Sequence, residues 1–363
     1  MTQTWNWQQA NWPHFTFDME TITPLEQAYA GLAGEFRGAL KHISHKAPNQ
    51  ITIELLTQEA METSKIEGEI LERNSVQSSI QRHMGLNPLK AKSKPSEEGI
   101  AAMMIDVFQE FKAPLSHSML FRWHEQITRG YEHLEQIGAY RSSKEPMQII
   151  SGPYGHTKIH FEAPPSDTMD MEMEVFIQWF NTTSSSLPPL TRASLAHLYF
   201  VSIHPFEDGN GRISRALIEK CLSQYQQQPA LTNLSHIITK KQSLYYDALA
   251  RNNQILEVTD WIQYLGDTII AAQKYTLKKI ELTIKKTKIY DEFKLNDRQI
   301  KVIEKLFAAE PNGFEGGLSA EKYITITNTT PSTATRDLQD LTNKEILLRT
   351  GERRHTRYTL NLS

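Results

Sequence analysis

The sequence HPFEDGNGRISR, residues 204–215, contains the residues from which a chemical function can be predicted. His204 opens it and is followed by a proline and a phenylalanine, which would fix the loop and leave the imidazole at its rim. An imidazole titrates near neutrality, so His204 is a candidate general base. Asp208 is a hard oxygen ligand of the kind that holds Mg²⁺ together with substrate phosphates. The first half of the stretch therefore predicts a base and a metal ligand on one loop.

The second half of the stretch predicts an anion site. Gly209, Asn210 and Gly211 lead into a helix, so their backbone N–H groups can point at an anion while the helix dipole adds to the attraction. Arg212 and Arg215 are three residues apart and share one face of the first turn, above these amides. Each residue alone is more often part of a capped turn or a solvated helix face. The whole set, in this order, favours a phosphate site.

The stretch resembles the motif of the Fic family, HPFx(D/E)GNGRxxR, and matches it at every fixed position. The resemblance implies transfer of AMP from ATP to Ser, Thr or Tyr hydroxyls of target proteins and of the protein itself, with release of pyrophosphate. It makes His204 the base that takes the hydroxyl proton and Asp208 the Mg²⁺ ligand. It also assigns the α-phosphate to residues 209–211 and the β- and γ-phosphates to Arg212 and Arg215.

A β-hairpin is predicted upstream of the motif, at about residues 147–162. Two short β-type runs there flank the turn-forming cluster Gly-Pro-Tyr-Gly-His-Thr. The Fic resemblance makes this hairpin the flap that holds a target protein by strand addition. It also assigns Ile150, Ser151 and Gly152 to the nucleotide side of the flap. An ordinary surface hairpin is the alternative.

A second motif lies before the flap, on a helix expected at about residues 50–72. Thr63 and Glu67 are four residues apart and would share one helix face. With the glycine that follows, they resemble the inhibitory motif (S/T)xxxE(G/N) of the same family. The resemblance implies that Glu67 pairs with Arg215 and blocks the γ-phosphate, so we expect low basal activity. Some relatives also use this glutamate to remove AMP, which stays open here, as does a solvated surface carboxylate.

An adenosine pocket is the weakest of the predicted sites. Tyr245 and Asn253 resemble the family segment in which a tyrosine packs on adenine and an asparagine closes the pocket. Tyrosine and asparagine on a helix are more often packing and surface residues. Both interpretations stay open.

Helical periodicity dominates the remaining sequence, so the expected fold class is mainly α. We expect an N-terminal cap at residues 1–22, a Fic-type helical core with its flap at residues 23–290, and a winged-helix domain at residues 291–363. Three helices and a basic hairpin predict this last domain. It could bind DNA through phosphate contacts, or another protein, including a second copy of the chain in a homodimer. A nucleotide-sensing DNA-binding regulator with little transferase activity is therefore the alternative to the enzyme.

Composition limits the partners. With 363 residues and 39 % hydrophobic content, the chain can bury a sizeable core. The 39 basic residues against 42 acidic ones leave a net charge of −3, which gives no global attraction to nucleic acid or anionic membrane. The single cysteine, Cys221, cannot form an intrachain disulfide. Neither a signal peptide nor a spanning run is recognised, so we expect a cytoplasmic protein without membrane attachment.

Overall fold

The structure is a computed structural model. It falls into two compact units, one made of Met1–Phe36 with Thr52–Thr276 and the other of Arg37–Ile51 with Leu277–Ser363. The sequence-based domain bounds stay a prediction beside this division. Within the chain, the structure describes residues 4–41, 47–86, 92–151, 158–310 and 313–362.

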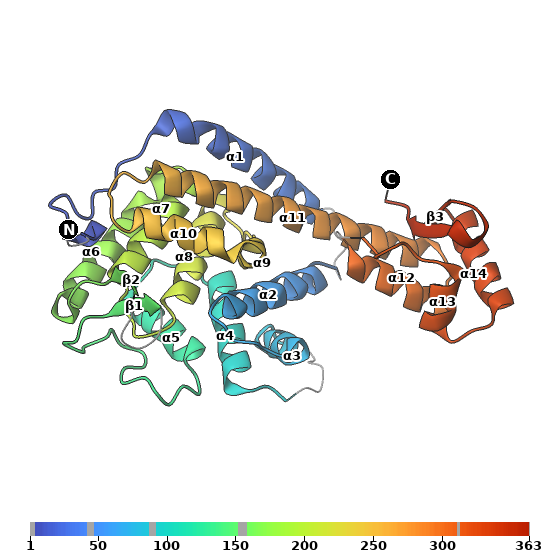
Figure 1. The fold of residues 1–363 in the computed structure, drawn as a ribbon, viewed down its shortest axis with the longest axis horizontal. Helices are drawn as coiled ribbons and strands as arrows, with labels where there is room; N and C mark the ends of the chain where they lie inside the picture. The colour runs from blue at the N-terminus through green and yellow to red at the C-terminus, as the bar shows by residue number, and fades with distance from the viewer. Residues whose placement is uncertain (1–3, 42–46, 87–91, 152–157, 311–312, 363) are drawn as a thin grey trace. The chain divides into compact units, whose positions relative to one another are not determined.

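Two buried helices form the centre of the first unit. Helix α7 (Pro189–Ile203) packs along α8 (Asn210–Gln226), with α4 and α5 against α8 and α6 against α7 (Figure 1). Nearly every residue of α7 is buried, including polar ones such as Arg192 and His197, which form hydrogen bonds. The 204–215 motif occupies the loop between α7 and α8 and the start of α8. The packing of both central helices therefore fixes the position of the motif.

The other elements surround this pair or continue beyond it. The α-helices are α1 (Met19–Lys41), α2 (Ala47–Ile66), α3 (Arg73–His83), α4 (Pro95–Gln109), α5 (His117–Ile127), α6 (Met169–Thr182), α9 (Leu234–Lys240), α10 (Gln242–Asn252) and α11 (Thr259–Glu292). Short 3₁₀ helices lie at Asn6–Gln8, Ser166–Thr168, Thr183–Ser185 and Arg353–His355.

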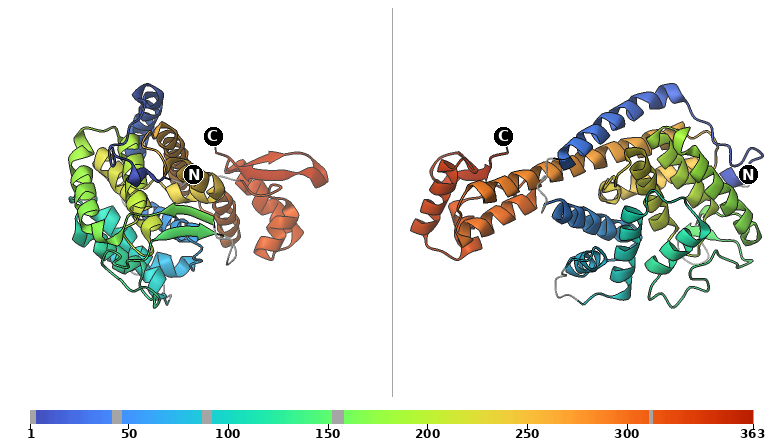
Figure 2. Two further views of the ribbon diagram at one scale, coloured as in Figure 1. Left: turned by 60° about the vertical axis from the view of Figure 1, so that its left-hand side comes forward. Right: turned by 180° about the vertical axis from the view of Figure 1, so that it is seen from behind.

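The predicted hairpin is present. Strands β1 (Gln148–Ser151) and β2 (Lys158–Glu162) pair antiparallel with a register shift between Ile149 and Ile150, and lie side by side in Figure 2. Phe161 of β2 is buried edge-on against Trp5, with ring centroids 5.3 Å apart. Trp7 Nε1 donates to the carbonyl of Glu162 at 2.7 Å. The aromatic N-terminal segment therefore anchors the base of the hairpin.

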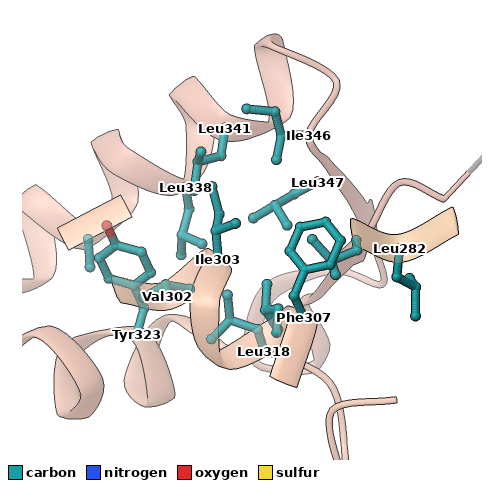
Figure 3. Packing of buried hydrophobic residues seen from close by; sticks show 13 residues of the cluster. Leu282, Val302, Ile303, Phe307, Leu318, Tyr323, Leu338, Leu341, Ile346 and Leu347 are labelled. Carbon is teal, nitrogen blue, oxygen red and sulfur yellow. The ribbon is translucent and has the colours of Figure 1, made fainter. Parts of the chain in front are cut away.

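The second unit has its own core. Helices α12 (Asp297–Ala309), α13 (Ala320–Thr327) and α14 (Pro331–Asn343) enclose a cluster of buried aliphatic and aromatic side chains with β3 (Leu347–Thr350) and β4 (Arg357–Leu360) (Figure 3). The three helices and the hairpin occur in the order that the sequence predicts. Their assignment as a winged helix stays a prediction.

The connection between α13 and α14 is short and sharp. Asn328 ends α13 with a left-handed backbone, φ 50°, which asparagine tolerates better than most residues. Thr330 then caps α14 by accepting a hydrogen bond from the backbone of Thr333. A turn this short is compatible with the helix-turn-helix part of the predicted winged helix.

No helix in the described part of the chain combines the length and apolar character needed to cross a membrane.

Leu338→Ala should lower the free energy of unfolding by about 3 kcal/mol, because Leu338 is fully buried in the second core and its loss leaves a cavity (Figure 3). Leu348→Ala is the matched control, since Leu348 is 48 % exposed, and should change it by less than about 0.5 kcal/mol. Urea denaturation measures both, and hydrogen exchange of α14 locates the effect. Equal losses would contradict the position assigned to Leu338.

Candidate active site

His204 ends the central helix α7 in an unusual conformation. Its backbone is left-handed, φ 52° and ψ 59°, while its N–H still donates to the carbonyl of Phe200 at 3.0 Å. Non-glycine residues adopt this region rarely, and such residues concentrate at functional sites. The imidazole lies near the hairpin residue Phe161, with ring centroids 6.5 Å apart. The candidate base therefore lies between the end of α7 and strand β2.

The surroundings keep His204 neutral. Burial lowers the pKa of His204 to about 4, and the positive charge of Arg141 acts in the same direction. Glu67 and Asp208 oppose this shift. At neutral pH the imidazole therefore carries one proton and has one nitrogen free to accept another.

The side chain of Asn210 closes the motif loop. Its Oδ1 accepts from the backbone of Phe206 at 3.0 Å, and its Nδ2 donates to the carbonyl of Phe206 at 2.8 Å. Phe206 stacks on His124 at 4.2 Å between ring centroids. Gly209 begins α8 with φ 83°, and a Cβ there would collide with Ile127. The sequence assigned residues 209–211 to an anion site by their backbone; the structure adds that the Asn210 side chain shapes the loop.

Asp208 is a partly exposed carboxylate of the loop. Its side chain is 40 % exposed, and Oδ1 lies 3.5 Å from Arg212 Nη2. The same oxygen accepts from the backbone of Gly209 at 2.5 Å. Among the described residues, no group of three or more His, Cys, Asp or Glu side chains could hold a metal ion. One exposed carboxylate nevertheless fits Mg²⁺ that is bound mainly through substrate phosphates and water.

The structure brings Arg215, Thr63 and Glu67 together. Arg215 is buried, donates from Nε to Thr63 Oγ1 at 2.7 Å, and donates from Nη2 to the Thr63 carbonyl at 3.0 Å. The same Nη2 lies 2.7 Å from Glu67 Oε1. The Glu67 carboxylate also lies so close to Gly211 that any Cβ there would collide with it. A carboxylate of the protein itself thus lies over the first turn of α8.

Glu67 follows the last residue of helix α2 rather than lying within a helix. The expected helix at about 50–72 is wrong at this end, because α2 stops at Ile66. Gly68 has φ 84°, its N–H donates to the Lys65 carbonyl, and the Glu69 N–H donates to the Ser64 carbonyl. These two bonds and the left-handed glycine form a Schellman motif. The helix termination therefore sets the position of the carboxylate.

Polar contacts fasten α2 to α9 and α10. Glu59 accepts from the backbone and hydroxyl of Ser235, and burial raises the pKa of Glu59 to about 7. Glu62 accepts from the hydroxyl of Thr239 at 2.8 Å. The carbonyl of Ile66 accepts from Gln242 Nε2 at 2.8 Å. These contacts hold the end of α2 where Glu67 reaches Arg215.

Two residues around Arg212 were not predicted. Arg212 Nη1 lies 3.3 Å from Glu69 Oε2 and 3.1 Å from the hydroxyl of Tyr131. Each motif arginine therefore faces a carboxylate from the turn after α2. The one available sequence signal was the Glu-Gly-Glu run at residues 67–69; nothing in the sequence connects Tyr131 to the motif.

The predicted adenosine residues have different surroundings. Tyr245 is only 2 % exposed, and its hydroxyl bonds to His197 Nε2 at 2.8 Å. The neighbouring Tyr246 is 45 % exposed and donates to the Ile66 carbonyl. An adenine can stack only on an accessible ring, which Tyr246 offers and Tyr245 does not. Asn253 donates to the His160 carbonyl of β2 at 3.3 Å. The nucleotide roles of Tyr245 and Asn253 stay predictions.

The flap residues are described in part. Ile150 is 56 % exposed, and the Ser151 hydroxyl bonds to His160 Nε2 across the hairpin at 2.5 Å. Gly152 lies outside the described residues. The nucleotide roles assigned to these three residues also stay predictions.

Comparisons with known proteins agree with this geometry. Residues 114–222 match the Fic/DOC family, and residues 5–86 match a domain of unknown function, DUF4172. A stretch of 110 residues is 37 % identical to "Protein adenylyltransferase Fic" of Drosophila virilis. This stretch is 30 % of the chain and 21 % of that relative, so the chain spans about a fifth of the curated relatives it matches. The chain therefore carries a Fic domain.

Solved structures show the same fold. A Fic family protein from Desulfovibrio desulfuricans G20 has a TM-score of 0.56 and 19 % identity over 96 % of this chain and 98 % of that one. A Fic domain containing signaling protein from Bacteroides thetaiotaomicron VPI-5482 has a TM-score of 0.51 and 18 % identity over 71 % of this chain and 96 % of that one. The resemblance from the motif, and the mainly α class with a hairpin, are confirmed.

The imidazole of His204 should stay neutral on titration from pH 7 to pH 5 in the nucleotide-free protein, because burial and Arg141 lower its pKa to about 4. Imidazole NMR with labelled histidine, assigned with a His204→Gln variant, measures this. Exposed His14 serves as an internal reference for an accessible imidazole. A midpoint for His204 near pH 6.5 would contradict the burial argument.

Proposed function

We propose that this chain is a self-inhibited protein adenylyltransferase that transfers AMP from ATP to Ser, Thr or Tyr hydroxyls of target proteins and of itself. One observation carries the proposal: His204 ends α7 and a single loop joins it to α8, whose Arg215 contacts Thr63 and Glu67. Names of relatives support the reaction class, and the cytoplasm is the proposed compartment.

The reaction follows from this arrangement. His204 takes the proton of the target hydroxyl as its oxygen bonds to the α-phosphorus of ATP. The bond from that phosphorus to the bridging oxygen breaks, and pyrophosphate leaves with the electron pair. Backbone N–H groups of residues 209–211 stabilise the charge on the α-phosphate, while Arg212 and Arg215 bind the two other phosphates. The exposed edge of the hairpin would hold the target segment beside His204.

Asp208 would hold Mg²⁺ together with the phosphates. The ion, when bound, neutralises charge on the phosphates and on the leaving pyrophosphate.

Inhibition follows from competition between anions. Arg215 has Nε and Nη2 on Thr63 and Glu67, and the Glu67 carboxylate lies over Gly211 where a phosphate would approach. A carboxylate and a phosphate cannot occupy the same donors together. ATP would therefore bind with its γ-phosphate displaced, in a pose that does not react.

Glu67→Gly should raise AMP incorporation into the protein itself at least about tenfold, because it frees Arg215 for the γ-phosphate. Labelled ATP with Mg²⁺ and phosphorimaging measure the incorporation. Glu54→Gln is a matched control that should leave the incorporation unchanged, since Glu54 lies on α2 and its carboxylate pairs with Arg73 rather than with Arg215.

His204→Ala in the Glu67→Gly background should abolish the label, and Asp208→Ala should lower it strongly. Label that survives the loss of His204 would refute it as the base. If no form incorporates AMP, the proposed transfer is wrong.

A second function has support in the C-terminal unit, which we assign to duplex DNA. Two of its acidic residues form ion pairs with basic residues outside the hairpin: Asp337 is buried and pairs with Arg298 at 2.8 Å, and Asp340 pairs with Lys344 at 2.7 Å. Among the described residues, the exposed arginines of the β3–β4 hairpin and of α14 form no ion pair. These arginines are Arg336, Arg349, Arg353 and Arg354.

The double change Arg353→Ala and Arg354→Ala should weaken binding to random duplex DNA and reduce the slope of affinity against salt by about 2, because each arginine would neutralise about one phosphate. Fluorescence anisotropy over a salt series measures this. Lys301→Ala with Lys305→Ala on α12 removes the same charge elsewhere in the unit and should change little. Equal effects, no binding, or a dimer that forms through this unit would contradict the assignment.

A further inference from the structure

Arg141 connects three segments around the candidate base. Its Nε donates to the carbonyl of His204 at 2.8 Å, and its Nη2 donates to the carbonyl of Pro164 at 2.5 Å. Nη2 also lies 3.5 Å from the carbonyl of Ile203, and the Arg141 backbone N–H donates to the carbonyl of Pro205 at 2.9 Å. One side chain thus joins the end of α7, the motif loop and the exit of the hairpin.

Arg141 is a buried charge without an ion-pair partner in the described part of the chain, which is unfavourable for a core residue. Arg141 is 4 % exposed, and no carboxylate within the described ranges forms an ion pair with it. Burial lowers its pKa to about 10, so it remains charged at neutral pH. Burying a charge without a counter-charge is unfavourable, and here the cost is partly offset by carbonyls at the negative end of α7. An apolar side chain would avoid this cost but would leave the carbonyls of His204 and Pro164 without these donors, so the guanidinium acts through the contacts it makes.

The contacts converge on the strained residue. His204 needs a left-handed backbone to leave the helix, and Arg141 binds its carbonyl. Pro164 follows the segment in which Phe161 packs near the His204 ring. The planar guanidinium has donors in fixed directions, so it can hold both carbonyls at a set spacing.

We propose that Arg141 is a positioning residue that fixes the backbone of His204 relative to the exit of the hairpin, so that the imidazole meets a hydroxyl presented on that hairpin. The inference rests on the proposed transfer reaction. It adds a residue 63 positions before the base, outside the motif.

Arg141 also contributes to the electrostatics of the base. The charged groups that act on His204 are Arg141, which lowers its pKa, and Glu67 and Asp208, which raise it. Without Arg141 the imidazole would bind a proton more readily. The role in positioning and the role in charge can be separated by substitution, because lysine keeps the charge but lacks the fork of donors.

The test compares variants in the Glu67→Gly background. Arg141→Met should lower kcat for AMP incorporation on the order of 100-fold, as expected for a displaced base. The affinity for Mg²⁺-ATP should stay within about twofold, since Arg141 contacts none of the groups assigned to phosphates. Arg141→Lys should recover only a small part of kcat.

Arg192→Met is the matched control. Arg192 is also buried and donates to a main-chain carbonyl, that of Phe180 at 2.8 Å, but it has no contact with the motif loop. Its loss should lower thermal stability and leave kcat nearly unchanged. If the two methionine variants lose kcat equally, or if Arg141→Met keeps kcat, the positioning role is wrong.

Imidazole NMR of nucleotide-free protein gives a readout that needs no transfer. The His204 ring signals should shift in both Arg141 variants, and the His204 pKa should rise from about 4 in Arg141→Met but not in Arg141→Lys. If Arg141→Met does not fold, the lysine variant decides by its ring signals and kcat. If Glu67→Gly itself transfers no AMP, the proposed function fails, and unchanged His204 signals would separately overturn the role of Arg141.

Discussion

The buried guanidinium of Arg215 is the constraint on which the site depends. A charge with so little access to water needs an anion or a set of carbonyl and hydroxyl acceptors, and the protein supplies them from Thr63 and Glu67. The same donors suit a phosphate. Under the proposed function, the resting protein and the nucleotide complex would therefore be two solutions to one electrostatic requirement.

The helices around Arg215 make that competition local. Arg215 lies on the central helix α8. The competing carboxylate of Glu67 follows the end of α2, which Glu59 and Glu62 bind to α9. On the opposite side, the end of α7 supplies the base. Three helix termini thus meet at one place, and the unpaired N–H and C=O groups of helix ends are the polar groups best suited to charged ligands and loops.

Much of this site was predictable because its parts are contiguous. Residues 204–215 form one loop and one helical turn, so their order in sequence already fixes their arrangement in space. The Thr63 and Glu67 pair was predictable from a short motif, although the end of α2 was misplaced because Gly68 was not recognised as a helix terminator. Arg141, Glu69 and Tyr131 could not be found, since only the tertiary fold brings them to the motif. The sequence also could not show which of Tyr245 and Tyr246 has an accessible ring. Adjacent residues on a helix point about 100° apart, so one ring is buried and the other is exposed.

The Schellman motif at Gly68 bears on how fast the Glu67 carboxylate could be released from Arg215. A carboxylate attached to a helix terminus can be withdrawn when that last turn frays, and helix–coil relaxation of short segments takes about 0.1–1 μs. Enzyme turnover is slower by several orders of magnitude. ATP would therefore meet an already equilibrated mixture of held and released Glu67, so residual activity would report the stability of one helical turn. Replacing Gly68 by asparagine, which also tolerates a left-handed backbone, would then change the residual activity without changing any charge.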